Sequence, residues 1–371
     1  MADFDNRNRR NDRNGRGGDG HGNNRRDGRA RAAEKHTADM GARFGKEIER
    51  ALAGVEFIDG MPKVKKAVKV EPVAEPEPEV EAVDEPQTEA AEAGTDTAAD
   101  LEAPADPEVS VEEGPEAPVV VPEVTIVDAS ATQAVLDGGR GYAQFCDLAL
   151  LDFASFVNPG GGYIRGAFAQ EEALCADSYL YNVLKEQKAW YGENRRRNIN
   201  CELYRNRGMV VPAVRFERNK MHAYADVIVV AAPNARRARE EYNVADAQWA
   251  DAMRDRIRFV LAICDKLGRE KLVAGAFGCG AFGGDAEQVA QMFREELASG
   301  NWGVKQVVFA VPQSRWDENL PKFNHVFANY PAANDEPYAV AAKRAAEAKA
   351  AEAAAAAADD DEDDDDWRKY L

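Results

Sequence analysis

The chain of 371 residues has few histidines, no closely paired cysteines and no long apolar run. Because a membrane-spanning helix needs roughly 18 consecutive apolar residues, neither a transmembrane segment nor a membrane partner is expected. The first 31 residues contain no apolar stretch of the kind found in secretory signals, so a cytoplasmic protein is expected. The five cysteines form no C-x-x-C pair, which argues against a zinc site or a disulfide framework. With only four histidines, metal-dependent catalysis is not expected.

Basic residues are absent from residues 71–123, which carry 18 acidic side chains. This composition predicts an extended acidic Pro/Glu/Ala linker. Residues 1–70 form a basic low-complexity region, in which residues 1–32 are predicted to be disordered and residues 33–58 to form one short helix. Residues 334–371 predict an Ala-rich solvated helix at 338–358, followed by an unfolded acidic tail at 359–366. The net charge of −19 therefore belongs to the flanks, because residues 124–333 hold 25 charges of each sign.

Residues 124–333 alternate between apolar runs and helical patterns and are predicted to form the catalytic domain. The runs predict six strands, at residues 124–127, 148–153, 209–216, 227–231, 271–276 and 306–311. The helices are expected at about 131–137, 168–188, 246–267 and 285–298. Continuous apolar strands are typical of a sheet that is covered on both faces. The expected fold is therefore a three-layer α/β/α domain with a mixed sheet of about six strands, flanked by disordered tails.

Two glycine-rich turns follow predicted strands of this domain. The first turn contains Asn158, Gly160, Gly161 and Gly162, and the second contains Gly278, Cys279, Gly280, Ala281, Phe282 and Gly283. Glycines let backbone N–H groups approach an anion, and the N-terminus of a following helix adds a favourable dipole. Either turn alone fits a tight turn without a ligand equally well. Two such turns at strand-to-helix junctions of one domain favour a ligand with a diphosphate.

The second turn also matches the dinucleotide-binding pattern Gly278-x-Gly280-x-x-Gly283. That pattern requires an acidic residue about 20 positions further on, at the end of the next strand. Here Pro312 and Gln313 follow the next predicted strand. A nicotinamide-dependent enzyme is therefore the weaker alternative.

Glu171 and Glu172, which follow Gln170, are the candidates for acid/base chemistry. Acidic residues are also common in the first turn of a helix for purely structural reasons. Neighbouring helical positions diverge by roughly 100°, so the two carboxylates cannot form the facing pair of an ordinary glycosidase. A helix N-terminus lowers a carboxylate pKa, so a general acid at this place needs burial to raise its pKa again.

The run from Leu151 to Cys175, with Asn158-Pro-Gly-Gly-Gly-Tyr163 followed by Gln170-Glu-Glu172, resembles the microbial-type poly(ADP-ribose) glycohydrolases. Ser178–Tyr181, Val227–Asn234 and Gly275–Gly283 support the resemblance, which covers about residues 124–315. It implies a macrodomain fold and hydrolysis of ribose–ribose O-glycosidic bonds in poly(ADP-ribose), or removal of ADP-ribose from modified protein. No metal or cofactor is implied.

The resemblance also implies a role for each motif residue. Glu172 would protonate the departing ribose oxygen through an oxocarbenium-like state, and Glu171 would bind ribose hydroxyls. The two glycine turns would cradle the diphosphate, with Phe282 against the distal ribose. The implied substrate-binding set is Asn158, Gly160, Gly161, Gly162, Gln170, Gly278, Cys279, Gly280, Ala281, Phe282 and Gly283.

Three positions depart from the family pattern: Asp152 and Gly284 stand where Asn is common, and Phe277 stands where Trp is common. They motivate a second hypothesis, a reader that binds ADP-ribose without cleaving it. For the flanks, the Arg-rich N-terminus is suited to weak contact with a polyanion, and residues 367–371 are a candidate docking tag for a partner protein, although solubilising spacers are the simpler interpretation. A fragment of residues 120–333 is accordingly expected to keep fold and activity.

Overall fold

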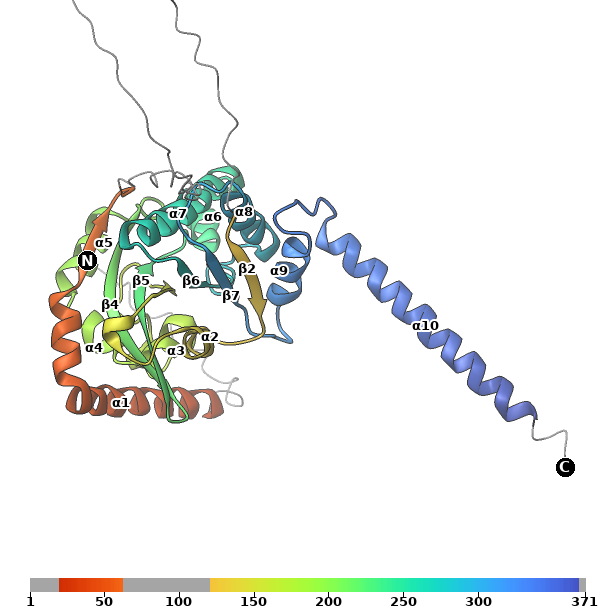
Figure 1. Cartoon of the computed structure of the whole chain (residues 1–371), viewed down its shortest axis with the longest axis horizontal. Helices are drawn as coiled ribbons and strands as arrows, with labels where there is room; N and C mark the ends of the chain where they lie inside the picture. The colour runs from red at the N-terminus through yellow and green to blue at the C-terminus, as the bar shows by residue number, and fades with distance from the viewer. Residues whose placement is uncertain (1–19, 63–120, 367–371) are drawn as a thin grey trace, which may run out of the picture. The chain divides into compact units, whose positions relative to one another are not determined.

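The computed structural model describes residues 20–62 and 121–366, and within them one mixed sheet of seven strands forms the centre (Figure 1). The spatial order is β1-β4-β5-β3-β6-β7-β2. The pairs β1/β4 and β4/β5 are antiparallel, and the other neighbouring pairs are parallel. The strands are β1 (Glu56–Asp59), β2 (Glu123–Val127), β3 (Leu148–Phe153), β4 (Arg207–Arg218), β5 (Met221–Val230), β6 (Lys271–Ala274) and β7 (Gln306–Ala310). All six predicted strands are confirmed, and the edge strand β1 is an addition.

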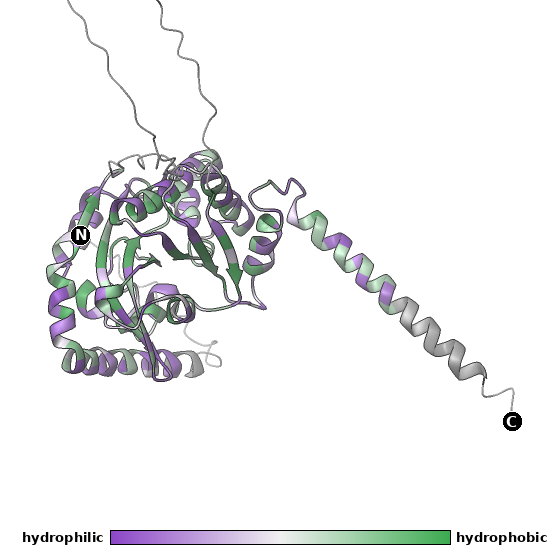
Figure 2. Ribbon diagram, viewed as in Figure 1, coloured by the Kyte–Doolittle hydropathy of each residue, from purple (hydrophilic) through white to green (hydrophobic). Residues whose placement is uncertain are grey.

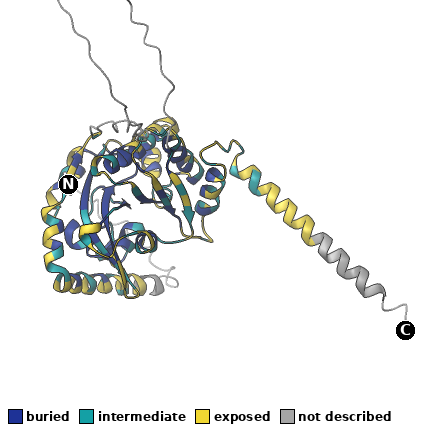
Figure 3. Cartoon of the chain, viewed as in Figure 1, coloured by how far each residue is buried: buried dark blue, intermediate teal, exposed yellow. Residues whose placement is uncertain are grey.

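Helices cover both faces of the sheet, as the alternation of side chains along β3 shows. Leu148 and Leu150 pack in one apolar cluster with α1 (Gly20–Ala53), α2 (Ala131–Gly138), α3 (Gln170–Ala176), α4 (Leu180–Leu184) and α5 (Lys188–Arg197). Ala149 and Leu151 pack in the other with α7 (Asp246–Leu267), α8 (Ala286–Ala298) and α9 (Asn319–Phe327). The central strands are hydrophobic and buried (Figures 2 and 3). The three-layer α/β/α expectation is confirmed.

The N-terminal region corrects two expectations. Residues 20–32, expected to be disordered, form the beginning of α1. The helix expected at 33–58 ends at Ala53, and β1 follows in its place at Glu56–Asp59. Residues 1–19 lie outside the described part. Ala33, Met40, Ile48 and Ala51 of this helix are buried in the apolar cluster on its face of the sheet. Because α1 contributes to the core and β1 extends the sheet, residues 20–62 belong to the same compact unit as residues 121–366. We therefore predict, against the expectation from the sequence, that a fragment starting at residue 120 does not fold alone.

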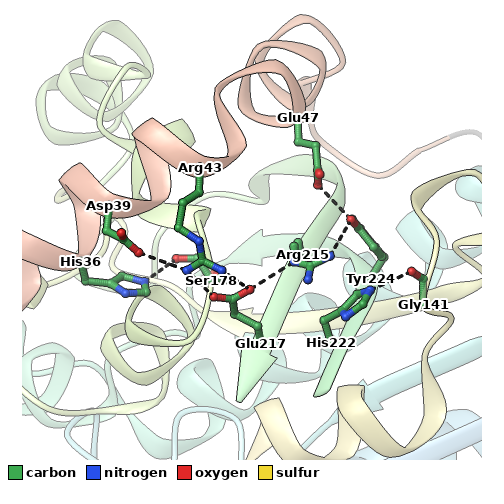
Figure 4. Close-up of polar contacts among 10 residues, drawn as sticks. All are labelled: His36, Asp39, Arg43, Glu47, Gly141, Ser178, Arg215, Glu217, His222 and Tyr224. Carbon is green, nitrogen blue, oxygen red and sulfur yellow. Dashed lines mark hydrogen bonds and ion pairs between the residues drawn. The ribbon is translucent and has the colours of Figure 1, made fainter. Parts of the chain in front are cut away.

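Polar contacts fasten α1 to the β4–β5 hairpin (Figure 4). Arg43 pairs with Glu217 of β4 at 2.7 Å, and its guanidinium also lies over the ring of Phe44. Tyr224 of β5 donates a hydrogen bond of 3.0 Å to Glu47. The helix bends between these contacts, at Phe44, whose backbone leaves helical geometry (φ −121°, ψ 25°).

Three further helical expectations differ from the structure. The helix expected at 168–188 is divided into α3, α4 and the start of α5, because Ser178 leaves helical pairing and bridges to Phe216 of β4. The helix α6 (Ala235–Tyr242) and α9 were not anticipated, and neither were the short 3-10 helices η1 (Ala143–Phe145) and η2 (Tyr163–Arg165). The solvated Ala-rich helix is confirmed as α10 (Tyr338–Asp366), but it continues through the aspartate run expected to be unfolded. Extending an existing helix costs much less than nucleating one.

The linker expected at 71–123 lies mostly outside the described residues, as do residues 367–371. Within the described ranges, no helix combines the length and apolar character that crossing a bilayer requires.

Candidate active site

A cavity of about 650 Å³ opens at the carboxyl ends of the parallel strands. Its wall contains Phe153 at the end of β3, Ala276 after β6 and Val311 after β7, together with the start of α3. Open α/β sheets commonly bind ligands at this edge, and the volume suits a nucleotide-sized molecule. The cavity contains these candidate residues: Gly161, Gln170, Glu171, Glu172, Gly278, Gly280, Ala281 and Phe282.

The first glycine turn is shaped so that only glycine fits at its centre. Gly161 adopts φ +59°, and a Cβ there would lie 2.6 Å from Glu172 Oε1 and 3.0 Å from Glu171 Oε2. Both glutamates therefore approach the backbone of Gly161, although they are adjacent on α3. Gly160 adopts φ +63°, and a Cβ there would meet the ring of Tyr181 at 2.6 Å.

The two carboxylates are fixed by different backbone donors. The Gly162 N–H donates to Glu172 Oε1 at 2.8 Å, and the Ser155 N–H donates to Glu171 Oε2 at 2.7 Å. Glu171 Oε1 is fully buried without a hydrogen-bond partner among the described residues, whereas Glu172 retains 8% exposure at the cavity wall. Glu172 is thus the glutamate better placed to reach a ligand atom.

A third carboxyl group, Asp152, lies beneath this pair. It is completely buried at the end of β3, and neither of its side-chain oxygens has a hydrogen-bond partner within the described part. Burial raises the pKa of Asp152 well above its ordinary value, and the negative charge of Glu172 raises it further. Burial and the charge of Asp152 likewise raise the pKa of Glu171, against the opposing effect of the Ser155 N–H. Burial and mutual repulsion therefore disfavour the charged forms of Asp152 and Glu171.

The Gln170 side chain forms hydrogen bonds with the backbone of β3. Its Oε1 accepts a 2.9 Å hydrogen bond from the Phe153 N–H, and its Nε2 donates at 2.9 Å to the Leu151 carbonyl. The side chain thus ties the first residue of α3 to the last residues of strand β3, which fixes both glutamates relative to the sheet. Gln170 also lines the cavity, so an additional contact with a ligand is compatible with this geometry.

The second glycine turn leads from β6 into α8. Gly278 adopts φ +77° and Gly283 φ +73°, and the Gly284 N–H closes the turn on the Gly278 carbonyl at 3.0 Å. Asp285 caps α8 by accepting from the Gln288 N–H at 3.0 Å. Phe282 lines the cavity and packs against Tyr204.

Five candidate residues stand outside the cavity wall: Asn158, Gly160, Gly162, Cys279 and Gly283. Asn158 Oδ1 accepts a 3.2 Å hydrogen bond from Arg195, while Gly162 acts on the site through Glu172. Cys279 Sγ contacts the Phe277 carbonyl at 3.6 Å, and burial raises its pKa, so its thiol is not activated.

Two of the departures from the family pattern have a structural explanation. Phe277 is fully buried against Phe153, with ring centroids 5.4 Å apart, and contributes to the core beneath the turn. At Gly284, a Cβ would lie 3.1 Å from the ring of Trp249, which is itself fully buried. Trp249 thus fills the space that a larger side chain at position 284 would need.

Part of the cavity wall was not anticipated from the sequence. Ser130 and Thr132 come from the start of α2, Gln313 and Asp317 come from the loop after β7, and Phe168 precedes α3. The first two of these segments follow the carboxyl ends of β2 and β7. Because β2 and β7 pair in parallel, both segments lie at the same edge of the sheet, and this pairing could not be predicted from the residue pattern.

Comparisons with known proteins give one matching family model and several similar solved structures. The family model for the catalytic domain of microbial-type PARG matches residues 39–219. The match begins within α1 and ends before the second glycine turn. No curated protein matches the chain.

Three solved structures show the range of similarity. The poly(ADP-ribose) glycohydrolase of Deinococcus radiodurans in complex with ADP-ribose is 29% identical, with a TM-score of 0.50, 57% of this chain and 86% of that one being covered. The enzyme of Thermomonospora curvata aligns over 80% of this chain and 98% of its own at 22% identity, with a TM-score of 0.57. Its form bound to the inhibitor ADP-HPD is 30% identical over 55% of this chain and 79% of that one, with a TM-score of 0.49.

Proposed function

The chain belongs to the microbial-type poly(ADP-ribose) glycohydrolases and is a glycosidase of that type, and from this we propose that Glu172 is its general acid. The proposed substrate is poly(ADP-ribose), cleaved at the ribose–ribose O-glycosidic bond. One observation carries the assignment: both glutamates line the cavity, but Glu172 is the more exposed of the two and is held in place by the Gly162 N–H, whereas Glu171 has one fully buried oxygen.

In the proposed reaction, Glu172 donates its proton to the oxygen that bridges two ribose rings. The bond between that oxygen and the anomeric carbon breaks, and positive charge develops on the ring of the terminal ribose. Glu171 holds the ribose hydroxyls and keeps the ring beside the acid. Water then adds to the anomeric carbon and releases a proton. Glu171 is assigned to the ribose hydroxyls and Asp152 is completely buried, so the phosphate of the substrate itself is proposed to assist the water.

The diphosphate of the terminal unit is proposed to lie between the two glycine turns. Both turns combine left-handed glycines with backbone N–H groups near the cavity, an arrangement suited to anions. Phe282 is proposed to contact the distal ribose, because its ring lines the same cavity.

The assignment of Glu172 is tested by release of ADP-ribose from poly(ADP-ribose). Glu172→Gln keeps the shape of the side chain but cannot donate a proton in the same way, so release should be abolished while ADP-ribose still binds in calorimetry. Glu186→Gln is the matched control, because Glu186 is exposed on the turn between α4 and α5. Turnover by Glu172→Gln equal to that of the control would refute the assignment.

The same pair of assays separates a hydrolase from a reader. Wild-type protein that binds ADP-ribose but releases no product, from either polymer or ADP-ribosylated protein, would be a reader. Product from ADP-ribosylated protein alone would restrict the substrate to modified protein.

A further inference from the structure

Arginine side chains gather on the outer side of the first glycine turn. From α1, Arg26 Nε donates to the Arg165 carbonyl at 2.9 Å, and Arg29 Nε donates to the Gly166 carbonyl at 2.8 Å. Arg165 Nη2 donates in turn to the Gly161 carbonyl at 3.3 Å. The guanidinium groups of Arg26 and Arg29 therefore donate to the carbonyl groups of two consecutive residues, and the first of these two residues, Arg165, supplies a third guanidinium group.

These three positive charges are not neutralised by carboxylates within the described ranges. None of Arg26, Arg29 and Arg165 forms an ion pair there. Other arginines of the domain do pair with a carboxylate, as Arg43 does with Glu217 and Arg258 with Glu296. All three residues are exposed. A guanidinium has five N–H donors, and Arg26 and Arg29 use only Nε for the contacts described. Their terminal nitrogens have no hydrogen-bond partner among the described residues and are available as donors for an anion.

The arginines lie next to the proposed acid. The peptide group between Gly161 and Gly162 accepts from Arg165 at its oxygen and donates to Glu172 at its nitrogen. One peptide group therefore separates a guanidinium from the carboxylate proposed to protonate the leaving oxygen. Phe168, three residues after Arg165, lines the cavity, and its side chain is largely solvent-exposed, with the residue 77% exposed.

We propose that Arg26, Arg29, Arg165 and Phe168 form a binding surface for the penultimate ADP-ribose unit of the polymer. This inference rests on the proposed function, since the chain that leaves from the Glu172 side is the remainder of the polymer. Its diphosphate complements the three guanidinium groups, and its adenine offers a flat face to the ring of Phe168, as in other sites that combine basic and aromatic side chains. The surface selects polymer over substrates with one ADP-ribose unit.

The test compares two substrates with the same scissile ribose. One is poly(ADP-ribose), and the other is ADP-ribose joined to a nitrophenol, which lacks a penultimate unit. The double substitution Arg26→Gln with Arg29→Gln should raise KM for polymer by roughly three- to tenfold, which is ordinary for losing exposed charge contacts with phosphate. Turnover of the nitrophenol substrate and calorimetric affinity for ADP-ribose should not change.

Three further measurements sharpen the test. Arg26→Lys with Arg29→Lys should restore most of the polymer KM, because charge is retained while the Nε contacts are lost. Phe168→Ala should raise KM for polymer more than KM for the nitrophenol substrate, and it should leave folding intact because the ring is exposed. Lys35→Gln removes one charge from the opposite side of α1, at an exposed residue, and should change neither substrate.

The outcomes separate this inference from the proposed function. Equal loss on both substrates in the Arg26/Arg29 variant would show that α1 only positions the glycine turn and would overturn the inference, as would an unchanged polymer KM. Binding of polymer to Glu172→Gln protein gives a readout that needs no turnover. If wild-type protein releases nothing from polymer, the proposed function fails, while weaker polymer binding after Arg26/Arg29 substitution in the Glu172→Gln background would still support the surface.

Discussion

Replacing Asp152 by asparagine should change how the stability of the protein depends on pH. Asp152 is fully buried, and both of its oxygens lack hydrogen-bond partners among the described residues. Burial and the charge of Glu172 raise its pKa above the ordinary value of 3.8. The folded protein therefore retains a proton that the unfolded chain releases. Asparagine has a similar shape, carries no charge and does not titrate.

The sign and size of the effect follow from proton linkage. Where the unfolded chain has lost the proton and the folded chain has kept it, the unfolding free energy falls by about 1.4 kcal/mol for each pH unit. The stability that Asp152 contributes is complete below its unfolded pKa and is lost as pH rises toward its folded pKa. Asp152 also raises the pKa of Glu171, so the asparagine variant should lose part of the contribution of Glu171 to this slope as well.

Urea unfolding measured at intervals between pH 5 and pH 8 provides the assay. The difference between Asp152→Asn and wild type should grow in favour of the variant by up to about 1.4 kcal/mol per pH unit, until the folded pKa of Asp152 is passed. Asp251→Asn, at an exposed position on α7, is the control and should leave the wild-type slope unchanged. Parallel curves for Asp152→Asn and wild type would show that Asp152 is not a protonated group of the folded state.

Three other predictions test the site and the domain. Gly161→Ala should lower turnover by about a hundredfold in a polymer-hydrolysis assay, because its Cβ would lie 2.6 Å from Glu172 Oε1 and displace the carboxylate; normal turnover would contradict the steric argument. Met40→Ala should lower the unfolding free energy in urea by about 2–5 kcal/mol, since Met40 is 2% exposed in the core. A fragment of residues 121–333 lacks α1 and β1 and should show no cooperative thermal transition in circular dichroism, in contrast to the full chain.

The central strands were predictable because a strand that is buried on both faces of the sheet has a continuous run of apolar residues. The run at 148–153 is almost wholly apolar, and in the structure β3 is the middle strand of the sheet. The edge strand β1 was not predictable, because only Ile58 of its four residues is buried. A four-residue strand with one buried position has neither the length nor the alternation that distinguishes strands from loops.

The candidate site was predictable to the extent that its residues lie together in the chain. Gln170, Glu171 and Glu172 follow the glycine turn within a few positions, and the structure brings them onto it. The third carboxyl group of the site, that of Asp152 on β3, could not be predicted in this way. In the sequence Asp152 is only a departure from the family pattern. Its burial depends on the packing of α3 against β3, which the Gln170 side chain ties together.

The Arg-rich N-terminus shows why composition alone misled the interpretation of the flanks. The buried side of α1 includes Ala33 and Met40, which do not stand out in a sequence rich in arginine and glycine. At Gly166 the backbone of the domain comes close to the backbone of α1. Gly166 adopts φ +70°, and a Cβ there would collide with the carbonyl oxygen of Arg26. A low-complexity sequence cannot form a core by itself. A few apolar residues on one side of a helix are nevertheless enough to pack that helix against a core formed by the rest of the domain. Two arginines of this segment, Arg26 and Arg29, are exposed beside the first glycine turn. They are the residues for which a role in polymer binding is proposed.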